Sequence, residues 1–331
     1  MRNPFALTLI ALVIMLILSM AIGSVFIPPA ELWRVISGSA DNETFRTILL
    51  DIRLPRTILI ALVGAALAGS GAAYQGLFRN PLADPYLIGV ASGAGLGAIL
   101  AMSIRWPYTT LGLLAVPMAA FITSLMTVYI VYTIAHIGGS VPTTNLILAG
   151  VAVSSFAISL TSFFMLRSTG EVRRAIGWML GGVSLVGWDA TLALIPYLAL
   201  GLVALILGSY SLNVLQFGDD QAAQMGLNVR RAKSIIIVAA SLVTAAAVSF
   251  AGIIGFVGLI VPHIVRIWWG VDYRRLIPLS IISGASVLLI ADVLARIVLA
   301  PQELPVGVVT ALAGAPFFLW VLRGAKHQGI W

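Results

Sequence analysis

The feature that most constrains this chain is a series of apolar runs, each about 20 residues long and nearly free of charged side chains. Such a run forms a helix across a membrane, because a helix satisfies its own backbone hydrogen bonds in lipid. The run over residues 234–269 is too long for one crossing, and Gly252 and Gly255 mark the break in it. About ten spanning helices are therefore predicted, at residues 5–27, 57–78, 86–104, 111–135, 146–166, 191–215, 234–269 (two helices), 276–299 and 306–322.

The composition is that of an all-α polytopic membrane protein. Of 331 residues, 60% are hydrophobic and only 9% are charged, which is too few to cover a water-facing surface. The net charge of +7 is spread along the chain, so arginines facing lipid headgroups explain it and no nucleic-acid partner is expected. The chain has no cysteine, which excludes disulfides and thiolate metal sites. We expect the first apolar run to be retained as a helix, because it is as long as a full span.

An even number of crossings places both chain ends on one side of the membrane. The positively charged residues divide almost equally between the two sides under this arrangement, so they do not choose which side is cytoplasmic.

Charge within the predicted spans is nearly confined to Asp292 and Arg296, four residues apart on one helix face. An ion-driven carrier needs ionisable groups at membrane depth, and this pair is either self-neutralised or gives Arg296 a functional role. His263 follows a proline in an apolar context, and we interpret it as structural. The sequence thus disfavours a secondary carrier. It also offers no nucleophile–base set for an enzyme, which leaves a channel or a permease driven by a separate subunit.

Residues 216–233, the coupling segment, form the one long polar interruption in the second half of the chain. Gly218 opens the segment, Asp219 and Asp220 suit the amino terminus of a helix, and Gly226 suits its end. Three cationic residues then precede the next apolar run. The segment is either an ordinary hydrophilic loop or one or two short helices outside the bilayer that transmit force from a partner.

Several motifs in one order extend over nearly the whole chain from about residue 28. They are RLPR (residues 53–56), QGLFRNPLADP (75–85), LAGV (148–151), GFVGLIVPH (255–263), ADVLAR (291–296) and ELPVGVVT (303–310). These motifs resemble those of the FecCD-type permeases, the membrane subunits of type II ABC importers for iron-siderophore complexes, haem and vitamin B12. Several long motifs in register are far more specific than any one alone.

The resemblance implies a single permease domain over residues 1–331 that works as two copies with the pathway between them. It also implies two cytoplasmic ATPase subunits and a periplasmic substrate-binding protein, in a bacterial or archaeal cytoplasmic membrane with both termini cytoplasmic. ATP would be bound by the partner, so no catalytic residue and no cofactor is expected in this chain. The sequence has no Walker-type glycine loop.

The resemblance also assigns three candidate sites. ATPase coupling would involve Gly218, Asp219, Asp220, Ala222, Ala223 and Gly226, and a cytoplasmic gate would involve Thr143, Thr144 and Asn145. Binding-protein docking would involve Arg53, Arg56 and Arg296. We expect the guanidinium groups of Arg53 and Arg56 to project from the mouth of the second helix, and Arg296 to lie near the outer end of the ninth. Alternatively, these arginines reach lipid headgroups and have Asp51 and Asp292 as local partners.

The cargo is the least determined property. The motifs are shared by siderophore, haem and cobalamin importers, and no residue in the apolar runs is a credible iron ligand. We expect an iron complex moved whole, with cobalamin as the alternative.

Overall fold

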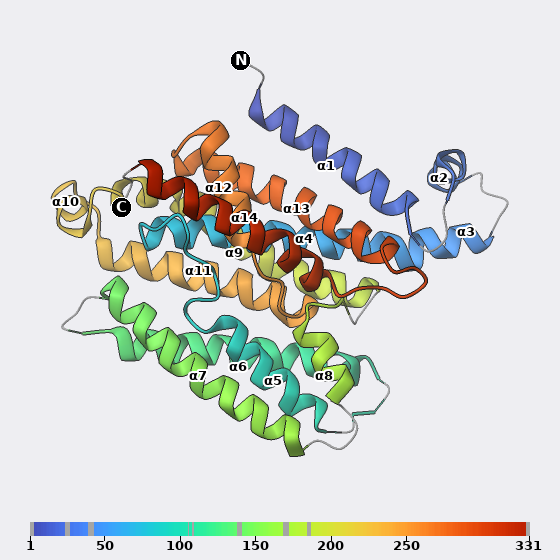
Figure 1. The fold of residues 1–331 in the computed structure, drawn as a ribbon, viewed down its shortest axis with the longest axis horizontal. Helices are drawn as coiled ribbons and strands as arrows, with labels where there is room; N and C mark the ends of the chain where they lie inside the picture. The colour runs from blue at the N-terminus through green and yellow to red at the C-terminus, as the bar shows by residue number, and fades with distance from the viewer. Residues whose placement is uncertain are drawn as a thin grey trace.

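Every secondary-structure element that the structure describes is a helix (Figure 1). The structure is a computed structural model and describes residues 3–23, 27–38, 43–104, 106–107, 109–137, 141–167, 172–183 and 187–328. Its helices are α1 (Pro4–Ala21), α2 (Pro29–Ile36), α3 (Glu43–Thr47), the π-helical η1 (Ile48–Arg53), α4 (Leu54–Leu77), α5 (Val90–Met102), α6 (Thr110–Ala135), α7 (Thr143–Arg167), α8 (Val172–Met179), α9 (Trp188–Leu215), α10 (Asp219–Gln224), α11 (Val229–Ala251), α12 (Val257–Trp269), α13 (Tyr273–Ile297) and α14 (Val306–Gln328).

The ten predicted spans correspond to helices of this structure. Within the described residues, 7 helices are long and apolar enough to cross a membrane, and α5, α12 and α14 supply three shorter apolar segments. The break predicted near Gly252 is confirmed, because α11 ends at Ala251 and α12 starts at Val257. The start predicted for the second span is too late. α3, η1 and α4 form one continuous helical rod from Glu43 to Leu77.

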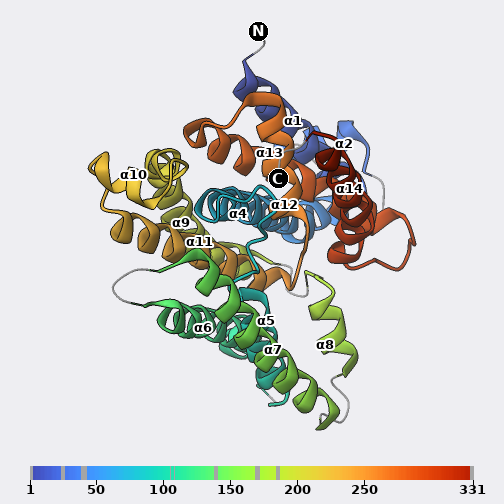
Figure 2. The ribbon, with the colours of Figure 1, turned by 60° about the vertical axis from the view of Figure 1, so that its left-hand side comes forward.

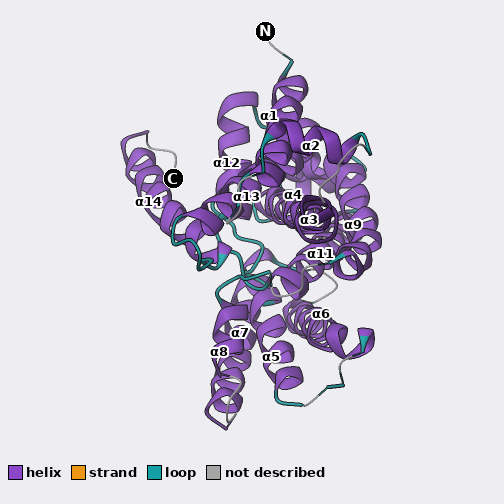
Figure 3. Cartoon of the chain, turned by 90° about the vertical axis from the view of Figure 1, so that its right-hand side faces the viewer, coloured by secondary structure: helices purple, strands orange, loops and turns teal. Residues whose placement is uncertain are grey.

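Helix α4 is the centre of the bundle. It is surrounded by α9, α11, α12 and α13 in Figure 2 and is seen end-on among them in Figure 3. Small side chains allow this close packing: Gly64 of α4 and Gly284 of α13 approach so closely that a Cβ on either would collide with the other backbone. In lipid, where apolar surface gives little drive for helices to associate, close backbone contact of this kind holds spanning helices together.

Helices α5, α6 and α7 form a second group, with α8 beside them at one end (Figure 1). This group joins the α4 bundle mainly through α11, which packs against α6 and α5. The Tyr132 hydroxyl of α6 lies 2.8 Å from the Ser234 hydroxyl of α11, which fixes the register of the two groups.

The bundle has two ends that differ in content. The α10 end holds α10, the start of α7, the end of α4 and the start of α13, and both α1 and α14 are oriented with their chain ends toward it (Figure 1). The opposite end holds α2, α3 and η1, the end of α1 and the end of α13. The prediction that both termini lie on the same side is consistent with this arrangement.

Candidate functional site

The coupling segment folds as a short helix between two glycines. α10 spans Asp219–Gln224, with Gly218 before it at a φ of 101° and Gly226 after it at a φ of 86°. Both angles lie in the left-handed region, which a residue with a Cβ adopts only with strain. The glycines therefore frame the helix as the sequence predicts.

This segment is fixed to the spanning helices. The Ala222 side chain is fully buried, and Asp219 forms an ion pair with Lys233 of α11, which is itself only 7% exposed. Gln216 donates a hydrogen bond from Nε2 to the Gly76 carbonyl oxygen at 3.0 Å, near the end of α4. A force on α10 would therefore reach both α4 and α11.

The outer surface of the segment is exposed and partly apolar. Phe217 is 60% exposed and Met225 is 59% exposed, on either side of α10, and Asp220 and Ala223 are exposed between them. Large apolar side chains in such a patch, rimmed by polar groups, are typical of a surface that contacts another protein. Ala222 does not belong to this surface, because it faces inward.

The residues predicted for the gate lie at the first turn of α7, which starts at Thr143 at the α10 end (Figure 1). Thr144 is exposed, whereas Thr143 and Asn145 are partly buried. The structure thus brings the predicted gate and the predicted coupling segment to one end of the bundle.

The connection between α4 and α5 begins at the same end and runs into the bundle, where Tyr86 donates a hydrogen bond to the Ile254 carbonyl oxygen and the segment packs against α7. The Gly150 backbone of α7 approaches the Leu87 carbonyl so closely that a Cβ would collide with it. Within the turn, Asp84 accepts a hydrogen bond from the Tyr86 N–H at 2.7 Å. Burial raises the pKa of Asp84 to about 6, although that hydrogen bond lowers it.

At the opposite end, the three predicted docking arginines lie in one charged group with Asp292 and Glu303, here called the arginine cluster. Arg56 bridges two acids from different parts of the chain, at 3.0 Å from Asp292 and 2.8 Å from Glu303. Asp292 also pairs with Arg296 at 3.0 Å, so the predicted pairing on α13 is confirmed. Asp292 has no exposed surface, so Arg56 and Arg296 compensate a buried carboxylate.

Two of these arginines cap the end of α1. Arg53 donates from Nη1 to the carbonyl oxygens of Met20 and Ala21, at 2.7 and 3.1 Å. Arg296 donates from Nη1 and Nη2 to the Ser19 carbonyl oxygen, at 3.1 and 3.2 Å. The last carbonyls of a helix lack partners within it and carry partial negative charge, so guanidinium groups stabilise them.

The expectation that the guanidinium groups of Arg53 and Arg56 both project outward is therefore wrong for Arg53. Arg53 is 6% exposed and Arg296 is 5% exposed, because the end of α1 covers both. Arg56 is closer to the surface, with its side chain 14% exposed, and its partner Glu303 is 45% exposed. Only this pair faces the outside within the arginine cluster.

Sequence reasoning missed two participants in the arginine cluster, Glu303 and Ser19. Glu303 lies 247 positions along the chain from its partner Arg56. Ser19 receives a hydrogen bond from Arg296 through its side-chain oxygen at 3.0 Å. One sequence feature could have pointed to Glu303: it is a lone acid directly before an apolar run. Among the described residues, no group of three or more histidine, aspartate or glutamate side chains could hold a metal ion.

Comparison with known proteins connects this architecture with one family. Residues 11–324 match the FecCD transport family. The chain belongs to that family. It is 44% identical to the cobalamin import system permease protein BtuC of Halobacterium salinarum over 288 residues, which cover 87% of this chain and 76% of that protein. It is 38% identical to the hemin transport system permease protein HmuU of Yersinia pestis over 337 residues, which cover 99% of this chain and 97% of that protein.

The fold of this FecCD permease also matches a solved structure. A metal-chelate type ABC transporter in an inward-facing conformation superimposes with a TM-score of 0.83 at 28% identity, over 97% of this chain and 98% of that one. The predicted type II ABC importer permease fold is confirmed. The protein is a multi-pass membrane permease of an ABC importer, and the family is one of transport rather than catalysis.

Proposed function

We propose that this FecCD permease works as a homodimer with the pathway between its two copies, driven by two cytoplasmic ATPase subunits and supplied by a periplasmic binding protein. The coupling segment is the observation that carries the proposal. It presents an exposed, partly apolar surface at Phe217 and Met225, yet it is fixed to α4 and α11 beneath. A surface that is exposed outside and rigid inside suits an element that passes motion from a partner to spanning helices.

The proposed orientation follows from that role. The α10 end, with both chain termini, faces the cytoplasm, and the arginine cluster faces the periplasm of a bacterial or archaeal cytoplasmic membrane. Residues 1–331 act as one permease domain, with residues 216–233 as its cytoplasmic coupling region.

The proposed cytoplasmic gate is the first turn of α7, with Thr143, Thr144 and Asn145 near their counterparts in the second copy. Support comes from the exposed Thr144 at the α10 end. Thr144→Cys should crosslink between copies to an extent that changes with bound nucleotide. Thr133→Cys, an exposed residue near the end of α6, is the matched control and should not crosslink. Equal crosslinking at both positions would remove Thr144 from the gate.

Docking of the binding protein is proposed at Arg53, Arg56 and Arg296, with a division of labour. Arg56 would meet an acid of the binding protein directly, because its partner Glu303 is partly exposed and can be exchanged. Arg53 and Arg296 would hold α1 in place and add positive potential beneath that surface. Opposite charge at such a surface speeds association and sets orientation more than it adds affinity.

The proposed cargo is an iron complex, either a ferric siderophore or haem. The relative named for hemin transport supports it, and the relative named for cobalamin import supports vitamin B12 as the alternative. The deciding experiment reconstitutes the permease with its ATPase and binding protein in vesicles, and measures uptake of ferric siderophore, haem and cobalamin with and without ATP. We expect ATP-dependent uptake of one of the iron complexes. Uptake of cobalamin alone would establish the alternative, and uptake without ATP would contradict the importer.

A further inference from the structure

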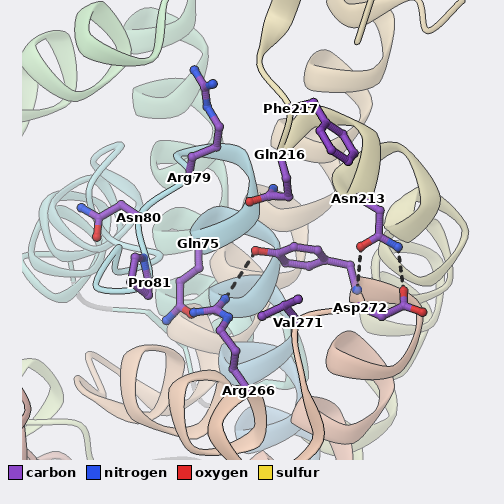
Figure 4. A pocket seen from close by; sticks show the side chains of 11 residues that line it. Gln75, Arg79, Asn80, Pro81, Asn213, Gln216, Phe217, Arg266, Val271 and Asp272 are labelled. Carbon is purple, nitrogen blue, oxygen red and sulfur yellow. Dashed lines mark hydrogen bonds between the residues drawn. The ribbon is translucent and has the colours of Figure 1, made fainter. Parts of the chain in front are cut away.

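A cavity of about 540 Å³ lies at the α10 end, at the edge of the bundle (Figure 4). The ends of α4, α9 and α12 and the start of α13 surround it. Its lining includes Gln75, Asn213, Arg266, Val271, Asp272 and Tyr273. This space is separate from the arginine cluster, and the first two residues of the coupling segment, Gln216 and Phe217, form one side of it.

Two polar groups in the lining lack partners. Among the described residues, nothing accepts a hydrogen bond from Arg266 Nη1, and nothing donates one to Gln75 Oε1, although both atoms are buried. Gln75 is 1% exposed, and its Nε2 is committed to the Leu259 carbonyl oxygen at 3.0 Å, which fixes Oε1 as an acceptor. Leaving buried groups of this kind unpaired destabilises the fold. They are thus expected to meet a ligand or water.

No carboxylate in the lining serves Arg266. Asp272, the one acid among the described residues that line the cavity, accepts hydrogen bonds from Arg274 at 3.2 Å and from Asn213 at 2.6 Å. These bonds hold the pKa of Asp272 down to about 2, so it is ionised and engaged elsewhere. Within the part of the chain that the structure describes, the Arg266 side chain makes only a long contact, from Nη2 to the Tyr273 hydroxyl at 3.4 Å, drawn as a dashed line in Figure 4. Its positive charge is left available to an anion.

The surroundings of the cavity are those of a membrane interface. Directly after Arg266 in the chain, Ile267 is 63% exposed and Trp268 is 67% exposed, and Val271, which lines the cavity, is 68% exposed. Tryptophan is enriched at the level of lipid headgroups, where one side of its ring meets the acyl chains. An apolar surface for acyl chains therefore adjoins a buried cation.

We propose that this cavity binds the headgroup of an anionic phospholipid that carries hydroxyl groups, as phosphatidylglycerol does. Arg266 binds a phosphate oxygen, Gln75 Oε1 accepts a hydrogen bond from a headgroup hydroxyl, and the acyl chains lie along Ile267 and Trp268. The ligand that these residues would recognise is a phosphate anion with a hydroxyl donor close to it. The volume favours a headgroup over one bridging water, since a water molecule takes about 30 Å³.

The test uses the purified full-length permease in detergent, titrated with short-chain phosphatidylglycerol and followed by native mass spectrometry. Arg266→Gln should weaken binding about tenfold, as expected for the loss of one charge-assisted hydrogen-bond partner. Arg275→Gln is the matched control, because Arg275 is exposed on the neighbouring α13 and does not line the cavity. We expect it to bind as the wild type does. Equal loss in both variants would overturn the site.

Three further arms separate the sources of the anion. Phosphatidylcholine of equal chain length should bind more weakly than phosphatidylglycerol, and inorganic phosphate should not displace the lipid. Displacement by inorganic phosphate would assign the cavity to a free anion. Loss of bound lipid on assembly with the ATPase subunits would assign it to the partner protein. If Arg266→Gln does not fold, Arg266→Lys serves as the second variant. It keeps the positive charge but lacks the planar guanidinium group, and it should still bind phosphatidylglycerol more weakly than the wild type does.

Discussion

The two ends of this FecCD permease carry charge in opposite ways. In the arginine cluster, Arg56 and Arg296 face buried Asp292, and Arg53 and Arg296 cap the carbonyls of α1. At the α10 end, Arg230, Arg231 and Asp220 are exposed to solvent beside the apolar Phe217 and Met225. Ionised groups that leave water must be compensated within the chain, whereas exposed groups stay available to a partner.

This contrast teaches that a charged motif does not by itself mark a docking surface. Arg53 and Arg296 lie in the motifs that suggested docking, yet both donate hydrogen bonds to carbonyl oxygens at the end of α1. The surface of the cluster that a partner can reach is the Arg56–Glu303 pair. Most mutations in the arginine cluster are therefore expected to affect the stability of the fold. Mutations on the exposed surface at the α10 end are expected to affect the binding of a partner.

The largest expected effect is on stability at the arginine cluster. Asp292→Asn removes the carboxylate shared by Arg56 and Arg296. It leaves buried Arg296 without its acid and Arg56 with Glu303 alone, which should cost about 3–5 kcal/mol in the free energy of unfolding. The measurement is denaturant unfolding of the purified permease. Glu31→Gln is the control, because Glu31 pairs with Arg34 in a solvent-exposed pair worth about 1 kcal/mol or less. Equal losses in the two variants would mean that burial does not distinguish the cluster.

A smaller effect should separate docking from support within the cluster. Arg56→Gln should weaken binding of the periplasmic binding protein by about tenfold and reduce its dependence on salt, since Arg56 would meet the partner directly. Arg53→Gln should instead lower the unfolding temperature and leave docking nearly unchanged. Binding kinetics at several salt concentrations measure the first effect, and thermal unfolding measures the second. If Arg53→Gln weakens docking as much as Arg56→Gln does, the proposed division of labour fails.

The smallest expected effect concerns pH at the connection between α4 and α5. The pKa of Asp84 is raised in the fold to about 6 from its ordinary value of 3.8, so between these values the folded state holds a proton that the unfolded state has lost. Its contribution to stability is therefore greatest below pH 3.8 and is lost as pH rises through 6, by an amount on the order of 1 kcal/mol. Asp84→Asn should abolish this slope in unfolding measured between pH 4 and 6.5. A slope that persists in the variant would point to another group.

The sequence predicted the spanning helices and the family well, because both depend on local information. Runs of apolar residues identify spanning helices without information on which helices pack against them. The glycines on either side of α10 indicate where that helix begins and ends. The short helices α2 and α8 were missed, since they lie in polar segments without an apolar run.

The surroundings of the arginines could not be predicted from local pattern. The pairing of Asp292 with Arg296 is visible at a spacing of four, but the contacts of Arg56 connect α4 with α13 and with the turn before α14. The capping of α1 by Arg53 depends on how α1 lies against the bundle. Such contacts are set by helix packing, which the order of residues alone does not reveal.

The central claim is that the exposed face of α10 couples this permease to an ATPase, and Ala223 tests it most directly. The measurement is ATP-dependent uptake, with ATP hydrolysis, by the reconstituted complex that carries Ala223→Glu, with Ala223→Ser as the control. A bulky charge on the exposed face should abolish uptake or release the ATPase while the permease unfolds at its normal temperature, and the serine variant should transport normally. Uptake and transport-linked ATP hydrolysis at wild-type rates in Ala223→Glu would contradict the claim.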